Sequence, residues 1–273
     1  MQYLDSNSIL SEHQFGFRSS HSTSDQLIIT YDDITKYIDQ GLTVDLVFFD
    51  YSKAFDKVCH VVLLRKLSDI GVCHQILSWI QCFLTERKLH VKVSDSTSTE
   101  RNVTSGVPQG SVLGPLLFLI YVNHVVFGLK CRFKIFADDI KLYLCFSSSD
   151  LQVVERVIQD DISALVSTSK SWGLVMNVSK CICLRFCPRS STAPHEGISP
   201  YTIGDEPIKF SFSHSDLGVM IDRTLKFHNH VRRNANICNA LTTNLFSSTL
   251  SREADFLMNI YRAHIRTKVQ NQM

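Results

Sequence analysis

The stretch that decides the fold is Val44-Asp45-Leu46-Val47-Phe48-Phe49-Asp50, an apolar run that ends on a carboxylate. Its apolar residues fall on both faces of an extended chain, which is typical of a central strand covered on both sides. A carboxylate beside so many apolar residues is costly unless it is paired, hydrogen-bonded or bound to a metal ion. The run therefore predicts a buried sheet with an acidic group at the end of one strand.

A second acidic site lies far along the chain. Two short alternating runs within residues 132–144 flank Asp138 and Asp139, which predicts a tight β-hairpin with the acidic pair at its turn. Carboxylates at two strand ends can hold two Mg²⁺ ions about 4 Å apart, an arrangement that serves phosphoryl transfer. Ordinary turn chemistry is the alternative for each acidic site taken alone.

The remaining elements mix helices and strands without a repeated strand–helix–strand unit, so the sequence predicts an α+β fold. A helix begins after Ser22, and an apolar helix begins near Val112. The spacing of apolar residues predicts further helices at 61–70, 75–84 and 151–172 and in the last part of the chain. Strands are expected at 89–93, 180–186, 201–203 and 208–221, and residues 188–200 are expected to be a loop.

Composition narrows the class of protein without naming a function. The 273 residues are 44% apolar with a net charge of +2, so any nucleic-acid binding must come from a local patch. The nine cysteines include no Cys-x-x-Cys pair, which favours reduced thiols over a zinc site. No signal peptide is visible, and the apolar stretch 112–126 is shorter than the roughly 20 residues that span a bilayer. We therefore expect an intracellular protein, nuclear or cytoplasmic, that is not secreted and has no membrane partner.

Ordered motifs connect the two acidic sites. Residues 48–56 (FFDYSKAFD), 105–115 (SGVPQGSVLGP) and 136–139 (FADD) resemble motifs A, B and C of reverse transcriptases. Their extended forms resemble the non-LTR, LINE-type branch of jockey-like retrotransposons. Residues 14–23, 172–180 and 217–225 resemble flanking segments of the same family, so the resemblance covers nearly the whole chain.

This resemblance implies a right-hand polymerase fold, with a palm made of an antiparallel sheet backed by helices. Residues 1–43 would be partial fingers, 44–222 the palm with inserted fingers helices, and 223–273 a truncated helical thumb. The family's fingers segment upstream of Gln14 and its endonuclease and C-terminal domains are not found, so we expect a chain shortened at both ends. The usual Asn-Asp after motif B is Asn123-His124 here.

The resemblance also implies an activity, RNA-directed DNA polymerisation. The partners would be an RNA template, a DNA primer and dNTPs, and the cofactor two Mg²⁺ ions, for which Mn²⁺ can substitute. Asp50 and Asp138 would be the main metal ligands, with Asp139 as an auxiliary and a carbonyl of Phe49 or Tyr51 as a further donor. The alternative is a catalytically inactive retroelement remnant that at most binds nucleic acid.

Other family roles fall on single residues. Phe55 would be the steric gate against a 2′-hydroxyl, or else an ordinary core residue. Gln109 and Gly110 would contact the incoming nucleotide or the template base, or else form a turn before a helix. Lys180 would protonate the leaving pyrophosphate, or else be a surface lysine. Arg18 would contact template phosphates.

Overall fold

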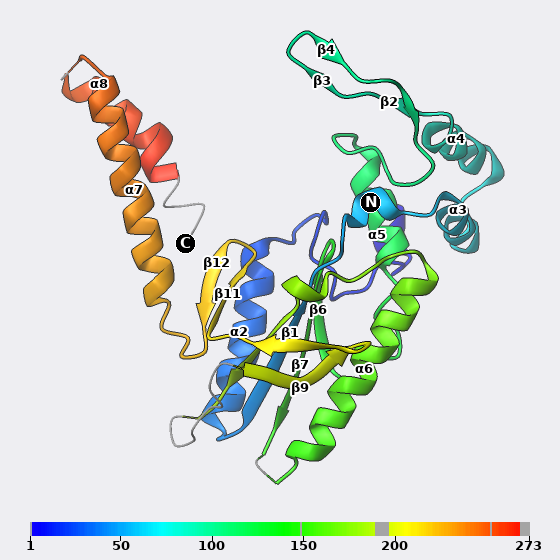
Figure 1. The fold of residues 1–273 in the computed structure, drawn as a ribbon, viewed down its shortest axis with the longest axis horizontal. Coiled ribbons are helices and arrows are strands. Elements are labelled where there is room, and N and C mark those ends of the chain that lie inside the picture. The colour runs from blue at the N-terminus through cyan, green and yellow to red at the C-terminus, as the bar shows by residue number, and fades with distance from the viewer. Residues whose placement is uncertain (1, 148, 189–196, 252, 268–273) are drawn as a thin grey trace. The chain divides into compact units, whose positions relative to one another are not determined.

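A computed structural model describes residues 2–147, 149–188, 197–251 and 253–267 (Figure 1). The chain divides into two compact units, Met1–Phe210 and Ser211–Met273. The first unit contains all three of the acidic, glycine-rich and hairpin motifs.

A six-stranded sheet is the centre of the first unit, with strand order β6-β7-β1-β8-β10-β9. The predicted central strand is β1, which pairs antiparallel with β7 on one side and with β8 on the other. Six of its seven residues are buried, as the apolar run predicts. The strands are β1 (Thr43–Phe49), β6 (Arg132–Phe136), β7 (Asp139–Phe146), β8 (Ile182–Phe186), β9 (Gly197–Ile203) and β10 (Glu206–Phe210).

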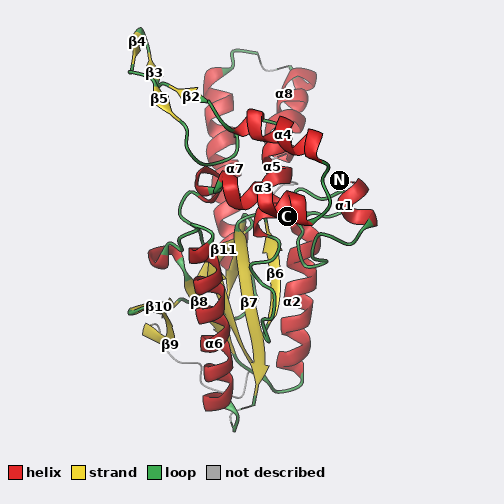
Figure 2. Cartoon of the chain, turned by 90° about the vertical axis from the view of Figure 1, so that its right-hand side faces the viewer, coloured by secondary structure: helices red, strands yellow, loops and turns green. Residues whose placement is uncertain are grey.

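Helices cover both faces of this sheet (Figures 1 and 2). On one face lies α2 (Thr23–Asp39), whose Asp33 carboxylate accepts a hydrogen bond of 2.8 Å from the Tyr143 hydroxyl of β7. On the other lies α6 (Leu151–Ser171), which shares an apolar cluster with alternate β7 residues such as Ile140. Because successive side chains of a strand point to opposite faces, β7 contacts both helices.

The same apolar cluster continues into α3 (His60–Asp69), α4 (His74–Leu84) and α5 (Leu113–Val122). Seven of the ten residues of α5 are buried, which explains why its sequence is apolar all round. Among the described residues, no helix combines the length and the apolar character needed to cross a membrane.

Several sequence-based boundaries were wrong; the strand expected at 208–221 is divided among β10, β11 (Ser213–Asp216) and β12 (Val219–Asp222). Residues 89–93 are not one strand: β2 (Lys88–Leu89) pairs with β5 (Arg101–Asn102), and β3 (Lys92–Val93) pairs with β4 (Ser96–Thr97), in an exposed hairpin. The cause is that this hairpin packs on no apolar face that would fix one long strand.

Another boundary concerns the expected loop 188–200, which in part is β9. Residues 189–196 lie outside the described residues, but β9 begins at Gly197. Pro200 fits there because β9 is an edge strand, where a missing N–H interrupts no ladder. A further boundary is that of the strand expected from Lys180: the 3₁₀ turn η2 (Val178–Lys180) comes first, and β8 begins at Ile182.

The second unit contains a two-stranded hairpin and helices. Its elements are β11 (Ser213–Asp216), β12 (Val219–Asp222), α7 (His228–Ser248), α8 (Ala254–Ile260) and the π-helical segment η3 (Tyr261–Arg266). The predicted apolar stripe of the last helix faces α7, where Leu257 and Ile260 line a cavity of about 230 Å³.

Candidate active site

The two predicted acidic sites meet at one end of the sheet. Asp50 directly follows β1, whose last residue Phe49 pairs with Ile140 near the start of β7. Asp138 lies in the turn that joins β6 to β7, where Phe136 pairs with Asp139. The hairpin prediction is therefore confirmed, and register places the end of β1 beside the hairpin turn.

Electrostatics shows that the two carboxyl groups interact. Burial raises the pKa of the Asp138 carboxyl above its ordinary value, and the neighbouring Asp50 carboxylate raises that pKa further. The backbone N–H of Asp138 and the Lys180 ammonium act in the opposite direction. Two ionised carboxylates side by side in a partly buried position require a compensating positive charge.

Asp50 has an unsatisfied oxygen. Its Oδ2 atom is buried and accepts no hydrogen bond within the part of the chain that the structure describes. Lys180 Nζ lies 3.3 Å from this atom, close enough for an ion pair but not aligned for a hydrogen bond. Because the Lys180 side chain is 63% exposed, this ion pair does not compensate the buried oxygen fully.

We tested whether these residues fit a divalent metal ion. The described residues include no group of three or more His, Cys, Asp or Glu side chains placed to hold a metal. The donors here are the Asp50 and Asp138 carboxylates, which offer the oxygen chemistry that Mg²⁺ prefers, with water and substrate completing its shell. The buried, unsatisfied oxygen of Asp50 beside Asp138 fits such an ion.

A short segment after α6 brings Lys180 to the site. Ser52 N donates to Val175 O at 2.9 Å, and Asn177 N donates to Asp50 O at 2.8 Å. These hydrogen bonds continue the main-chain pairing past the last residue of β1, and they hold η2 beside Asp50. Asp139, the third predicted carboxylate, is the exposed first residue of β7.

Phe55 lies in η1 (Ala54–Lys57), five residues after Asp50, and is partly buried. Its ring stacks on Phe118 of α5 with 4.1 Å between centroids. Phe17 contacts it edge-on at 6.2 Å. The ring orientation is thus fixed from two sides, as a steric gate and a core residue both require.

Gln109 and Gly110 lie in the loop before α5. Gln109 is exposed, and its Nε2 donates to Asp56 Oδ1 at 2.9 Å. Gly110 has a φ of +81° and open space where a Cβ would stand. The loop borders a groove of about 420 Å³, whose lining includes Asp56, Arg87 and Gln109.

Two residues that the sequence did not single out hold this loop. The Gly106 carbonyl accepts hydrogen bonds from His60 Nε2 at 2.9 Å and from Arg87 Nη2 at 2.7 Å. A Cβ at Gly106 would lie 2.8 Å from Asp56 Cα, so only glycine allows this approach. Neither His60 nor Arg87 stands in a pattern that distinguishes it from a surface residue.

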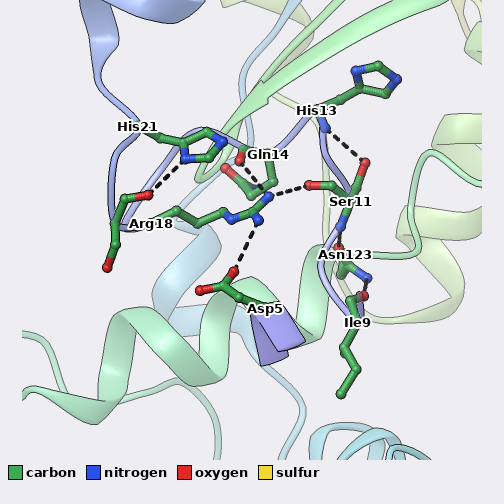
Figure 3. A network of polar contacts seen from close by, with 9 residues as sticks. Asp5, Ile9, Ser11, His13, Gln14, Arg18, His21 and Asn123 are labelled. Atoms are coloured by element: carbon green, nitrogen blue, oxygen red, sulfur yellow. Dashed lines mark hydrogen bonds and ion pairs between the residues drawn. The ribbon is translucent and has the colours of Figure 1, made fainter. Parts of the chain in front are cut away.

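Arg18 does not join the carboxylates. Figure 3 shows its guanidinium between the carbonyl of Ser11, at 2.8 Å, and the carboxylate of Asp5, at 3.0 Å. Its side chain is only 13% exposed. For Arg18 to contact a template phosphate, at least one of these two interactions would have to break. The phosphate-binding role of Arg18 stays a prediction.

The described architecture defines a class. A mostly antiparallel sheet backed by helices, in which, of the described strands, only β8 and β10 pair in parallel and two carboxylates lie at adjacent strand ends, is a polymerase palm. The chain matches the reverse transcriptase (RNA-dependent DNA polymerase) family over residues 1–211, so it belongs to that family.

Curated relatives are polymerases of mobile elements. The chain is 31% identical over 234 residues to the probable RNA-directed DNA polymerase from transposon X-element of Drosophila melanogaster, covering 84% of this chain and 25% of that protein. It is 27% identical over 235 residues to the RNA-directed DNA polymerase from mobile element jockey of the same species, covering 83% and 25%. These matches confirm the predicted LINE-type branch, and the chain spans about a quarter of these relatives' length.

Solved structures show the same fold. Apo telomerase from Candida tropicalis aligns with a TM-score of 0.54 at 13% identity, covering 82% of this chain and 39% of that one. Telomerase from Candida albicans in complex with a fragment of telomeric RNA aligns with a TM-score of 0.51 at 14% identity, covering 98% and 46%. At this identity the likeness concerns the fold alone, and the predicted right-hand palm is confirmed at that level.

Proposed function

We propose that this chain catalyses RNA-directed DNA synthesis, the transfer of a nucleotide from a dNTP to the 3′-hydroxyl of a DNA primer on an RNA template. The observation that carries the proposal is the pair Asp50 and Asp138 on adjacent strand ends, with the Asp50 Oδ2 atom buried and without a hydrogen bond among the described residues, beside the Lys180 ammonium. Family membership supplies the reaction type.

Reverse transcriptases use divalent metal ions. In this chain Asp50 and Asp138 would hold two Mg²⁺ ions, with Asp139 and a carbonyl of Phe49 or Tyr51 as auxiliary donors; Mn²⁺ would substitute. When bound, the ions lower the pKa of the attacking hydroxyl and stabilise charge on the phosphate oxygens.

The chain's own residues position the substrates. Lys180, whose Nζ lies 3.3 Å from Asp50 Oδ2, would hold a proton for the leaving pyrophosphate. Phe55, fixed by Phe118, would exclude a 2′-hydroxyl. Gln109, which lines the 420 Å³ groove, and Gly110 next to it would contact the nucleotide or template base. Most of the rate enhancement would come from positioning and charge stabilisation.

The domain limits and the location in the cell are part of the same proposal. Residues 1–43 would act as fingers, 44–222 as palm and 223–273 as thumb. An RNA template and dNTPs place the activity inside the cell, in the nucleus or cytoplasm. Parent-element partners, an endonuclease and a C-terminal domain, would supply targeting.

Primer extension tests the proposal. The full chain is assayed on poly(rA) with an oligo(dT) primer and Mg²⁺, beside Asp138→Asn, which keeps the shape of the side chain and removes its charge. We expect extension by the wild type and a loss of about 10²–10³-fold in the variant, the size of effect typical of losing one preorganised electrostatic group. EDTA should abolish extension by the wild type.

The contrary outcome is equally clear. Folded wild-type protein that binds template–primer but extends no primer would contradict the proposal. It would favour the alternative, a retroelement remnant that only binds nucleic acid.

A further inference from the structure

Gln14 lies against the hairpin turn that carries Asp138. Its side chain is fully buried, and its Oε1 atom accepts hydrogen bonds from two backbone donors, Gly16 N at 2.8 Å and Ala137 N at 3.0 Å. Since both partners are N–H groups, the atom facing them must be the amide oxygen. Ala137 directly precedes Asp138 and has a φ of +56°, which is rare for a residue with a Cβ.

The main chain around Gln14 adds to this contact. Phe15 N donates to Ile135 O at 2.8 Å, and Ile135 N donates to His13 O at 2.9 Å, so the segment pairs with the outer edge of β6. A Cβ on Gly16 would lie 2.5 Å from Ala137 N. The segment therefore approaches the turn as closely as a main chain can.

Residues outside the sheet hold the segment in place. Asn123 Oδ1 accepts from Ser11 N at 2.7 Å, and Asn123 Nδ2 donates to Ile9 O at 2.6 Å. Arg18 Nη1 donates to Ser11 O at 2.8 Å. Figure 3 shows these contacts converging on the loop that carries Gln14. The loop is thus tied to α5 and to its own N-terminal turn before it reaches the hairpin.

The amide nitrogen of Gln14 shows that the arrangement favours the hydrogen bonds of the amide oxygen. Gln14 Nε2 is buried and has no hydrogen-bond partner among the described residues. A buried donor without a partner costs stability, so placing the oxygen on Ala137 N is achieved at the expense of the nitrogen. An apolar residue would avoid that cost but would leave the two backbone N–H groups unsatisfied.

We propose that Gln14 is a positioning residue for the active site, which fixes the Ala137–Asp138 turn so that the Asp138 carboxylate faces Asp50. The inference rests on the proposed function for its catalytic consequence, while the clamp itself is a property of the fold. Gln14 touches no substrate. It acts through the conformation of Ala137, whose left-handed φ would relax without an acceptor for its N–H.

The test compares Gln14→Met, which keeps the length of the side chain and loses the acceptor, with Gln14→Glu, which offers an acceptor oxygen in either protonation state. Gln159→Met is the matched control: Gln159 also bonds main chain, accepting from Thr202 N at 2.8 Å, but at the far edge of the sheet. Three quantities are measured on folded protein: hydrogen exchange of peptides covering residues 135–140, Mn²⁺ affinity by electron paramagnetic resonance, and kcat with KM for primer extension.

We expect Gln14→Met to speed exchange at 135–140 by at least tenfold, to weaken Mn²⁺ binding by about tenfold, and to lower kcat with little change in KM for template–primer. Gln14→Glu should keep the slow exchange of the wild type at residues 135–140. Gln159→Met should resemble the wild type in all three measured quantities. The proposal would be overturned if Gln14→Met exchanged at residues 135–140 at the wild-type rate and bound Mn²⁺ with wild-type affinity.

A second variant covers the case in which Gln14→Met does not fold. Gly16→Ala leaves Gln14 unchanged but places a methyl group against Ala137 N, so it should produce the same three changes. Unchanged exchange at 135–140 in that variant would also overturn the proposal. If the wild type itself neither binds Mn²⁺ nor extends a primer, the proposed function fails, whereas the exchange data still decide whether Gln14 fixes the turn.

Discussion

Phe55 illustrates how a single residue can satisfy two roles. The ring is stacked on Phe118 and contacted edge-on by Phe17, so its position is set by packing on the first unit's apolar cluster. Its sequence position, five residues after Asp50, is also where the family places a steric gate. The packing explains how the gate would be held rigid, since a gate that moved would discriminate poorly.

The predicted consequence is a change in sugar selectivity. Phe55→Ala should admit ribonucleotides, because removal of the ring opens the space that a 2′-hydroxyl would occupy. We expect the kcat/KM for dTTP, divided by the kcat/KM for UTP, to fall by at least tenfold. Single-nucleotide extension measures both values. Phe118→Leu, which removes the stacked partner and keeps the Phe55 ring, should lower the selectivity less than Phe55→Ala does. Unchanged selectivity in Phe55→Ala would assign Phe55 to the core alone.

The meeting of the two acidic sites could be predicted from the sequence, because ordered motifs connect them. Each carboxylate taken alone also fits an ordinary turn or strand end. The contacts of Gln14, His60 and Arg87 could not be predicted. Each depends on a main-chain atom more than a dozen residues away, and no local spacing encodes such a partner. Arg18 shows the same limit, since its intramolecular partners became visible only in the fold.

At the scale of elements, β1 is held by a polar contact as well as by apolar packing. Asp45 of β1 is fully buried and accepts hydrogen bonds from Arg185 Nε of β8 at 2.6 Å and from the Tyr201 hydroxyl of β9 at 2.5 Å. Arg185 in turn lies over the rings of Phe146 and Phe210. One carboxylate thus connects three strands.

Removing this carboxylate should destabilise the fold strongly. Asp45→Ala leaves the Arg185 charge and the Tyr201 hydroxyl buried and short of a partner, which costs about 3–5 kcal/mol in the free energy of unfolding. Urea denaturation followed by circular dichroism measures it. Asp32→Ala is the matched control, because Asp32 pairs with Lys36 on the exposed surface of α2 and should change the unfolding midpoint very little. Equal midpoints for the two variants would contradict the prediction.

The elements that the sequence predicted well have a strong apolar pattern: β1 is apolar on both faces, α5 is apolar all round, and α6 has a helical period. The exposed hairpin 88–102 and β9 were predicted poorly for physical reasons. Leu89, Val91 and Val93 of the hairpin alternate with polar residues, but all three are exposed, so their alternation does not fix a single long strand. The proline in β9 normally argues against a strand, and only its edge position removes that objection.

At the scale of the whole molecule, the two units differ in how much they bury. Six of the seven β1 residues are buried, whereas α7 buries only His230 among its 21 residues. Local stability follows buried apolar contact, so the second unit should open at a much lower free energy than the sheet.

Hydrogen exchange followed by mass spectrometry measures this difference. We expect peptides from α7 to exchange at least a hundredfold faster than peptides from β1 at neutral pH, in the absence of nucleic acid. Each amide is compared with its own rate in unfolded peptide, which removes sequence effects. Equal protection of the two elements would show that the chain opens as one cooperative unit instead.

The strand order of the sheet has a further consequence, which concerns aggregation between copies of the chain. An open sheet exposes two edges, and unpaired edges recruit strands from neighbouring molecules into aggregates. Here the β6 edge is occupied at Ile135 by the segment that carries Gln14, and the β9 edge contains Pro200, which cannot donate to an added strand. The segment that holds the hairpin turn therefore also blocks edge-to-edge polymerisation, and a chain that lost it would be prone to form fibrils from its β6 side.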